Sequence, residues 1–190
     1  MKTAIFGGTF DPIHSAHIEM ARQAADRFQL DRVLFIPAGN PPHKHADTPF
    51  EHRYRMVELA CAADPRFIAS RLEEGERKSY SIDTIERVKA TAGNVFFIIG
   101  ADAFAEIQTW RRWQDVVRAV DFIVVARPGH EIVSPPGARV LRLETVELPV
   151  SSSEIRDALA RGEIPPDLPR AVADYIREHG LYRRASGLGS

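Results

Sequence analysis

The chain has one cysteine, no surplus of charge and no long apolar run. A single cysteine, Cys61, among 190 residues excludes an internal disulfide framework. The 25 Lys and Arg residues nearly balance the 26 Asp and Glu residues, so no large field attracts duplex nucleic acid or an anionic membrane. No apolar run reaches the length of a membrane span, and residues 1–7 are too few for a secretory signal. These absences predict a cytoplasmic protein with neither a nucleic-acid nor a membrane partner.

Familiar catalytic arrangements are missing as well. No Walker A lysine follows the glycines near the N-terminus, which excludes P-loop chemistry. No Ser–His–Asp or Cys–His arrangement and no compelling carboxylate pair is evident. Cys61 falls in a helical pattern, so we expect a small buried hydrophobic side chain rather than a nucleophile. A zinc site at His43, His45 and His52 would lack a fourth ligand.

Short apolar runs alternate with amphipathic segments along the chain. The runs that we expect to be strands cover residues 3–6, 32–36, 67–69, 95–99, 122–125 and 140–143. Apolar spacings of three and four predict helices between them, the first carrying Ile18, Ala21, Ala25 and Phe28. Strands without alternation, separated by helices, indicate a parallel sheet that is covered on both faces. The sequence therefore predicts an α/β fold with a Rossmann-like, doubly wound, mainly parallel sheet.

The C-terminal part of the chain is expected to be helical. One helix is predicted near residues 154–160, and a second is predicted to bear Leu168, Val172, Tyr175 and Ile176. No internal repeat or long linker is visible, so we expect one domain over residues 1–185. Residues 186–190 have the composition of a disordered tail.

The loop after the first expected strand carries the strongest chemical signal, because ligands of such folds bind beyond the carboxyl ends of the strands. Gly7 and Gly8 would let the main chain turn sharply and let a phosphate approach backbone N–H groups. The following helix adds a positive N-terminus, and His14 and His17 would face one side of its first turn. An isolated Gly-Gly would indicate only a strand–helix turn, but this combination favours an anion site. The His-x-x-His spacing does not match a zinc-binding pair.

Two further segments carry residues of chemical interest. Ser151 and Glu154 fit a helix capping box, and the same helix start, together with Arg156, would form a second anion site. Trp110 and Trp113 lie three residues apart, a spacing more typical of core packing than of a ligand platform.

Several motifs, in order along the chain, resemble one family. The segment from Gly7 to His17 is similar to the T/H-x-G-H signature of the nucleotidyltransferases, with Ala16 in place of the usual glycine. The other matching segments are Asn40-Pro41-Pro42-His43-Lys44, Ser79-Tyr80-Ser81-Ile82-Asp83-Thr84, Gly100-Ala101-Asp102, Trp110, Arg127-Pro128-Gly129 and Ser151-Ser152-Ser153-Glu154-Ile155-Arg156, in which Ser153 stands where threonine is common. Over nearly the whole chain the sequence resembles the bacterial nicotinate-nucleotide adenylyltransferase family.

The resemblance implies transfer of AMP from ATP to nicotinate mononucleotide, which yields deamido-NAD and pyrophosphate. It implies that His14, His17 and Arg156 are catalytic, with His17 on the α-phosphate. The ATP-binding residues that it implies are Gly7, Gly8, Thr9, Phe10, His14, His17, Ser151, Ser152, Ser153 and Arg156. The acceptor-binding residues that it implies are Asn40, His43, Lys44, Ser81, Asp102, Trp110 and Arg111, with Trp110 stacked on the nicotinate ring. No protein metal site is expected, and Mg²⁺ would enter as a bridge between the phosphates of ATP.

This reaction suits the residues that are present. A phosphomonoester has its second pKa near ~6, so the acceptor is already ionised at neutral pH and needs no general base. One alternative is a sister enzyme that uses nicotinamide mononucleotide, phosphopantetheine or an alcohol phosphate as acceptor, or CTP as donor. Another is a non-catalytic nucleotide sensor, which would most simply lack one of the histidines or Arg156. The oligomeric state is left open, a homo-oligomer included.

Overall fold

The computed structural model describes residues 1–42, 46–75, 77–145 and 151–184. Within these residues six strands form one sheet in the order β3-β2-β1-β4-β5-β6, and all pairings are parallel. The strands are β1 (Lys2–Gly8), β2 (Arg32–Pro37), β3 (Phe67–Ala69), β4 (Asn94–Gly100), β5 (Asp121–Ala126) and β6 (Arg139–Glu144). The strand order reverses between β1 and β4, which places the ligand-binding crevice of a doubly wound fold at their carboxyl ends. The expected α/β, Rossmann-like, doubly wound fold is confirmed.

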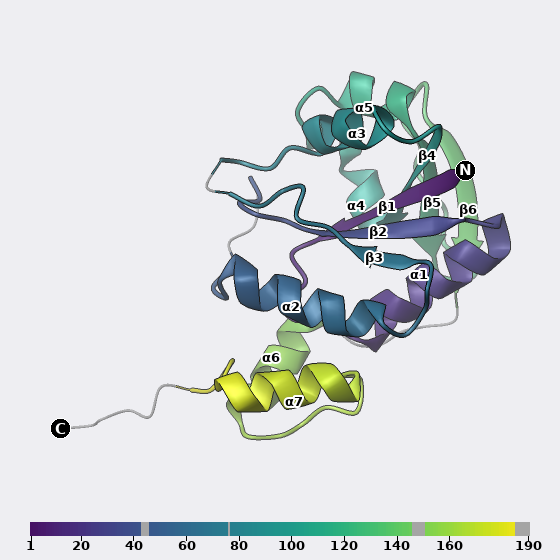
Figure 1. Ribbon diagram of the computed structural model, residues 1–190. Coiled ribbons are helices and arrows are strands. Elements are labelled where there is room, and N and C mark those ends of the chain that lie inside the picture. The colour runs from purple at the N-terminus through teal and green to yellow at the C-terminus, as the bar shows by residue number, and fades with distance from the viewer. Residues whose placement is uncertain (43–45, 76, 146–150, 185–190) are drawn as a thin grey trace.

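One face of the sheet is covered by helices from both ends of the chain. These are α1 (Ser15–Phe28), α2 (Phe50–Cys61), α6 (Ser152–Ala160) and α7 (Arg170–His179). Figure 1 shows α2, α6 and α7 on the same side of the sheet, with the yellow α7 lying against α2. Their apolar side chains join those of the strands in one buried cluster that includes Ile18, Val57, Ile155 and Val172. The C-terminal helices are therefore part of the core that supports β1.

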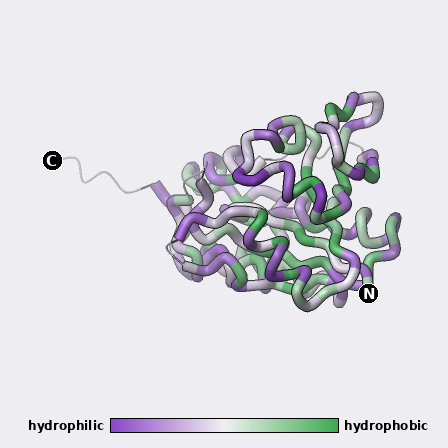
Figure 2. Tube along the Cα trace, turned by 90° about the horizontal axis from the view of Figure 1, so that it is seen from above, coloured by the Kyte–Doolittle hydropathy of each residue, from purple (hydrophilic) through white to green (hydrophobic). Residues whose placement is uncertain are grey.

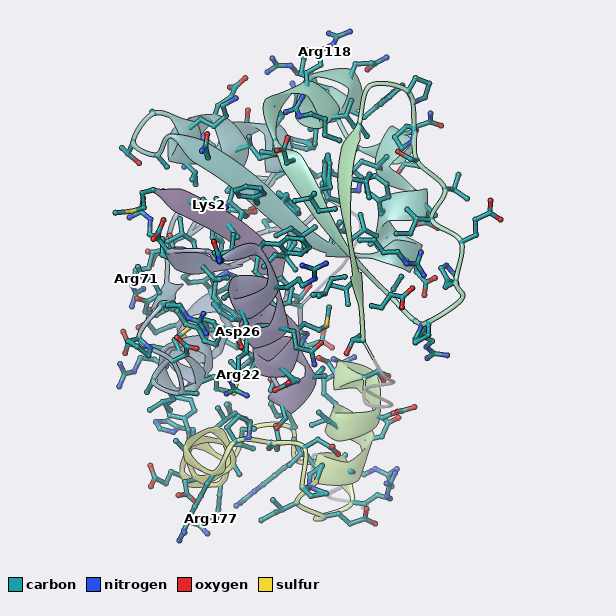
Figure 3. All side chains as sticks on the ribbon, turned by 90° about the vertical axis from the view of Figure 1, so that its right-hand side faces the viewer. Lys2, Arg22, Asp26, Arg71, Arg118 and Arg177 are labelled. Atoms are coloured by element: carbon teal, nitrogen blue, oxygen red, sulfur yellow. The ribbon has the colours of Figure 1, made fainter. Side chains whose placement is uncertain are left out.

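The opposite face is covered by helices from the middle of the chain. These are α3 (Ser81–Lys89), α4 (Ala101–Ala105), a 3₁₀ turn η1 (Ile107–Thr109) and α5 (Trp113–Ala119). Ile85, Phe104 and Val116 from these helices pack against Phe97 and Phe122 of the sheet. In Figure 2 green apolar segments gather in the middle of the molecule, between more hydrophilic outer segments. Figure 3 shows the labelled charged side chains, such as Arg118 and Arg177, at the outside.

Some helical details differ from the expectations. The sequence pattern specifies no helix within residues 101–119, and the structure places α4, η1 and α5 there. The expected last helix begins later than the apolar spacing indicates, because Pro169 is its N-cap and Leu168 is buried just before it. The tail at 186–190 lies outside the described residues. Among the described residues, no helix is both long and apolar enough to cross a membrane.

Cys61 ends α2 as a free, buried cysteine. Burial raises the pKa of its thiol to about 12, which keeps it protonated at neutral pH. The expectation of a small buried side chain at this position is confirmed.

Candidate active site

The turn after β1 is built by residues 9–14 rather than by the glycines. Gly7 and Gly8 complete β1, where they pair with Ile36 and Pro37, so the expectation of a sharp glycine turn was wrong. The chain turns at Phe10, which has a φ of 50°, and at the cis peptide bond between Asp11 and Pro12. A Cβ on Gly8 would come within 3.2 Å of the Phe10 ring. A side chain at position 8 would therefore crowd the ring of Phe10 in this turn.

His14 and His17 lie at the start of α1, as their spacing predicts. His14 is the N-cap residue, and its backbone N–H donates to Nδ1 of His17 at 3.1 Å. The two rings stack with their centroids 3.8 Å apart. His17 also meets the Phe10 ring edge to face, with centroids 5.1 Å apart. The turn and the first helical turn thus hold both imidazoles side by side.

His14 is only 4 % exposed, and its surroundings control its charge. Loss of solvent lowers the pKa of His14 to about 4, although Asp167 acts in the opposite direction. His14 is consequently neutral at pH 7 and has one N–H donor and one acceptor nitrogen. Its Nδ1 is buried and has no hydrogen-bond partner among the described residues. A neutral imidazole held in this way can donate one hydrogen bond without carrying a positive charge into the site.

The start of α6 is attached to the turn after β1. The Ser152 hydroxyl donates to the Pro12 carbonyl at 3.0 Å, and Nη1 of Arg156 donates to the Asp11 carbonyl at 2.8 Å. The expected capping box is present, because Glu154 N–H donates to Ser151 Oγ at 3.2 Å and Ser151 N–H donates to the Glu154 carboxylate. The structure therefore brings the two predicted anion sites together, with the N-termini of α1 and α6 at one turn.

A cavity of about 340 Å³ lies on the α3 side of the crevice. Gly7 and Gly8 line it from β1, and Ser81, Trp110 and Arg111 line it from the opposite wall. Ser81 is the first residue of α3, and the guanidinium of Arg111 lies 4.6 Å from the centre of the Tyr80 ring. Trp110 meets Phe97 edge to face, with centroids 5.7 Å apart. The structure thus gathers three of the predicted acceptor residues around one apolar-floored cavity beside the glycines.

Asp102 lies in a different cavity, of about 410 Å³, on the other side of Gly100. This second cavity is lined by Met20, by residues 100–102 and 125–127, and by His130 and Thr145. Gly100, the last residue of β4, borders both cavities. Arg127 belongs to one of the matching motifs but has no implied role, and no pattern in the sequence points to His130. Asp102 and Trp110 were both expected to bind the acceptor, but they line different cavities.

Asn40 does not line the first cavity, but its main chain pairs with Ser79, which does. Its N–H donates to Ser79 Oγ at 3.2 Å, and its carbonyl accepts from Ser79 N–H at 2.9 Å. At the neighbouring Gly39 the main chain passes close to Glu73, since a Cβ on Gly39 would lie 1.8 Å from the Glu73 carbonyl oxygen. The segment after β2 and the segment before α3 are thereby held together. His43 and Lys44 lie outside the described residues.

The described residues contain no group of three or more His, Cys, Asp or Glu side chains that could hold a metal ion.

Comparison with known proteins agrees with this geometry. A family model described as cytidylyltransferase-like matches residues 5–158. The chain belongs to the cytidylyltransferase-like family, and its class of enzyme is that of the nucleotidyltransferases. A protein of Solibacter usitatus, named "Probable nicotinate-nucleotide adenylyltransferase", is 60 % identical over 187 residues, which are 96 % of this chain and 100 % of that protein. A Thermus thermophilus protein of the same name is 43 % identical with the same coverage. Within the family, this chain groups with the nicotinate-nucleotide adenylyltransferases.

A solved structure shares the fold over nearly all of the chain. It is the Plasmodium falciparum nicotinic acid mononucleotide adenylyltransferase complexed with NaAD, which matches with a TM-score of 0.79 and 22 % identity. The match covers 95 % of this chain and 97 % of that one. The structural likeness shows that the six-stranded arrangement is common to both proteins.

Proposed function

We propose that the protein transfers the AMP group of ATP to nicotinate mononucleotide, releasing pyrophosphate and deamido-NAD. The observation that carries this proposal is the placement of two cavities on either side of Gly100, next to a turn at which two helix N-termini meet. One cavity has the size and aromatic wall for a nicotinate nucleotide, and the other has room for the adenosine of ATP. The high identity to the Solibacter protein over its whole length supports the same reaction.

In this reaction an oxygen of the acceptor phosphate attacks the α-phosphorus of ATP. A new phosphorus–oxygen bond forms as the bond from the α-phosphorus to the oxygen bridging the β-phosphate breaks, and pyrophosphate leaves with that electron pair. The acceptor phosphate is largely ionised at neutral pH, so no side chain has to remove a proton. The protein has to bring two anions together and stabilise the charge that moves onto the leaving phosphates.

The turn after β1 and the start of α6 are suited to this task. We assign His17 to the α-phosphate and neutral His14 to the phosphate chain, with Arg156 supplying positive charge beside the turn. The other residues that we assign to ATP are Gly7, Gly8, Thr9, Phe10, Ser151, Ser152 and Ser153. Ser152 and Arg156 donate hydrogen bonds to carbonyl oxygens of this turn. An approaching anion is therefore repelled by fewer free carbonyl oxygens.

The first cavity is suited to the acid form of the pyridine nucleotide. We assign Trp110 to the face of the nicotinate ring, and the N-terminus of α3 at Ser81, with Arg111, to its carboxylate. Donors at that point favour a carboxylate over a carboxamide, whose own N–H groups would face them. Asp102 is assigned to sugar hydroxyls, and it lines the second cavity next to Gly100, which borders both cavities. Asn40, His43 and Lys44 complete the proposed acceptor set.

Mg²⁺ belongs to the proposal only as a companion of ATP. When bound, it would neutralise charge on the phosphates through their oxygens and water, and no step is assigned to protein ligands of the ion. A cytoplasmic location, and action without nucleic-acid or membrane partners, are proposed on the near balance of 25 basic and 26 acidic residues. A homo-oligomer is compatible with the proposal but is not required by it.

The direct test is pyrophosphate release by the purified chain on a panel of acceptors. With ATP and Mg²⁺, nicotinate mononucleotide is expected to give the highest kcat/KM, and nicotinamide mononucleotide a much lower one. Phosphopantetheine and simple alcohol phosphates, and CTP in place of ATP, serve as the matched alternatives. Preference for any of these would indicate a sister enzyme. Absence of pyrophosphate release with every acceptor would overturn the proposal and favour a nucleotide sensor.

A further inference from the structure

A buried arginine lies beneath the site, among residues that the proposed reaction does not use. Arg53, in the first turn of α2, is 2 % exposed. Its Nε donates to the Thr48 carbonyl at 2.9 Å, and its Nη1 donates to the carbonyls of Thr9 at 2.9 Å and Ala38 at 2.7 Å. These acceptors belong to three separate segments: the turn after β1, the segment after β2 and the segment that leads into α2.

The surroundings of Arg53 differ from those of the surface arginines. Burial lowers the pKa of its guanidinium, while Asp11, which is 5 % exposed, acts in the opposite direction. The Tyr182 hydroxyl, which follows α7, donates to the Asp11 carboxylate. Arg55, two residues further along α2, instead forms an exposed ion pair with Glu58. Because an apolar side chain of similar size would pack a core at least as well as a buried charge, the retained guanidinium indicates a geometric role.

The carbonyls that Arg53 holds fix the direction of the neighbouring N–H groups. In a trans peptide the C=O and the N–H of the same unit point in opposite directions. When the Thr9 carbonyl points to Arg53, the Phe10 N–H points away from Arg53, and the Ala38 carbonyl orients the Gly39 N–H in the same way. The Asp11 carbonyl is likewise occupied by Arg156. Arg53 thus ties together the turn that we assign to ATP and the segment that borders the first cavity.

We propose that Arg53 is a positioning residue, which acts through the Thr9 and Ala38 carbonyls to hold the phosphate-binding turn and the acceptor segment in one fixed relation. It does not touch either substrate. The assignment of these segments to ATP and acceptor rests on the proposed function. Loss of the guanidinium fork is therefore expected to lower kcat in a chain that still folds. Small misplacements of reacting groups cost up to about 10²-fold in rate.

The test compares Arg53→Lys and Arg53→Met with the matched surface variants Arg55→Lys and Arg55→Met. Arg53→Lys keeps the charge beside Asp11 but has no planar fork to reach three carbonyls. Measured at 25 °C on folded protein, its kcat is expected to fall about 10- to 100-fold. Its Kd for α,β-methylene ATP is expected to rise, and the amides of Phe10 and Gly39 are expected to exchange hydrogen faster. Both Arg55 variants are expected to match the wild type in all three measurements.

Two results would overturn the proposal. One is a folded Arg53→Lys chain with kcat, analogue Kd and amide exchange within twofold of the wild type. The other is an Arg53→Lys chain that is unfolded at 25 °C, which would show a role in stability alone. Failure of Arg53→Met to fold would leave the decision to the lysine variant. If the wild type itself turned over no acceptor, the proposed function would fail, while amide exchange and analogue binding would still decide the role of Arg53.

Discussion

The imidazole rings of His14 and His17 stack face to face, with centroids 3.8 Å apart and an interplanar angle of 26°. Two positive charges at this separation would repel each other. Burial prevents this by lowering the pKa of His14 to about 4, so that ring is neutral under ordinary conditions. The two rings can therefore stack without the repulsion of two adjacent cations, and a phosphate bound there as we propose would meet a neutral His14.

His17→Ala is expected to lower kcat by about 10²–10³, the scale of loss when one preorganised donor is removed from a reacting centre. The fold is expected to survive, because the helix cap that His17 supplies to the His14 N–H contributes only about 1 kcal/mol. Steady-state pyrophosphate release and thermal unfolding measure the two effects. His179→Ala, an exposed histidine on α7, serves as the control and should leave kcat unchanged. Near-wild-type turnover by His17→Ala would contradict the assignment of His17 to the α-phosphate.

Acid is expected to destabilise the protein through His14. Its pKa in the folded state, about 4, lies below its ordinary value of 6.5, so the unfolded chain binds more protons between these values. The stabilising contribution is complete above pH 6.5 and falls with pH, by about 3 kcal/mol at pH 4. Urea unfolding of the wild type and of His14→Asn between pH 7.5 and 4 provides the measurement. If the two proteins lose stability in parallel, His14 does not cause the acid sensitivity.

Gly39→Ala is expected to destabilise the protein by about 1–3 kcal/mol or more, because overpacking forces the main chain to move. The added Cβ would lie 1.8 Å from the Glu73 carbonyl oxygen, which has to shift. The KM for nicotinate mononucleotide is expected to rise more than the KM for ATP, since the displaced segments border the first cavity. Gly93→Ala is the matched substitution, because a Cβ at Gly93 meets no atom within 4 Å. Equal stability of the two variants would contradict the close approach.

Trp110→Ala is expected to raise the KM for nicotinate mononucleotide about tenfold or more, since stacking of one ring on an aromatic side chain contributes about 1–3 kcal/mol. The KM for ATP should change little, because Trp110 lines the first cavity, beside α3, and is not among the residues that line the second cavity. Trp113→Ala is the matched control. Trp113 packs against the core cluster under α5, so its loss should lower the melting temperature and leave the ratio of the two KM values unchanged. If Trp113→Ala raised the KM for nicotinate mononucleotide and Trp110→Ala only lowered the melting temperature, Trp113 would be the acceptor-binding residue and Trp110 the core residue.

Much of the fold follows from the apolar pattern of the sequence. Runs such as 95–99 and 122–125 are apolar at every position because β4 and β5 are covered by helices on both faces. The capping box at Ser151 and Glu154 is a local signal, and the structure confirms it. The helices in residues 101–119 were missed because they are short and follow β4 without a turn signal.

The site was less predictable, because its geometry depends on contacts between distant segments. Sequence spacing places His14 and His17 together, but it does not reveal that burial leaves His14 neutral. The family resemblance groups Asp102 with Trp110 as acceptor residues, whereas in the structure they line two different cavities. One sequence signal for Arg53 was overlooked. Arg53 precedes Met56 and Val57 by three and four residues, so it lies on the same buried face of α2. A charge at such a position indicates a partner that only the folded chain supplies.

The turn that we assign to ATP is completed by residues far away in the chain. Ser152 and Arg156 reach Pro12 and Asp11 across sequence separations of 140 and 145 residues. During synthesis on the ribosome, β1 and β2 can pair long before these two side chains emerge. An unfinished chain therefore carries the histidine pair but not the complete turn, and we expect nucleotide to bind to the turn only after the helices that follow β6 have left the exit tunnel.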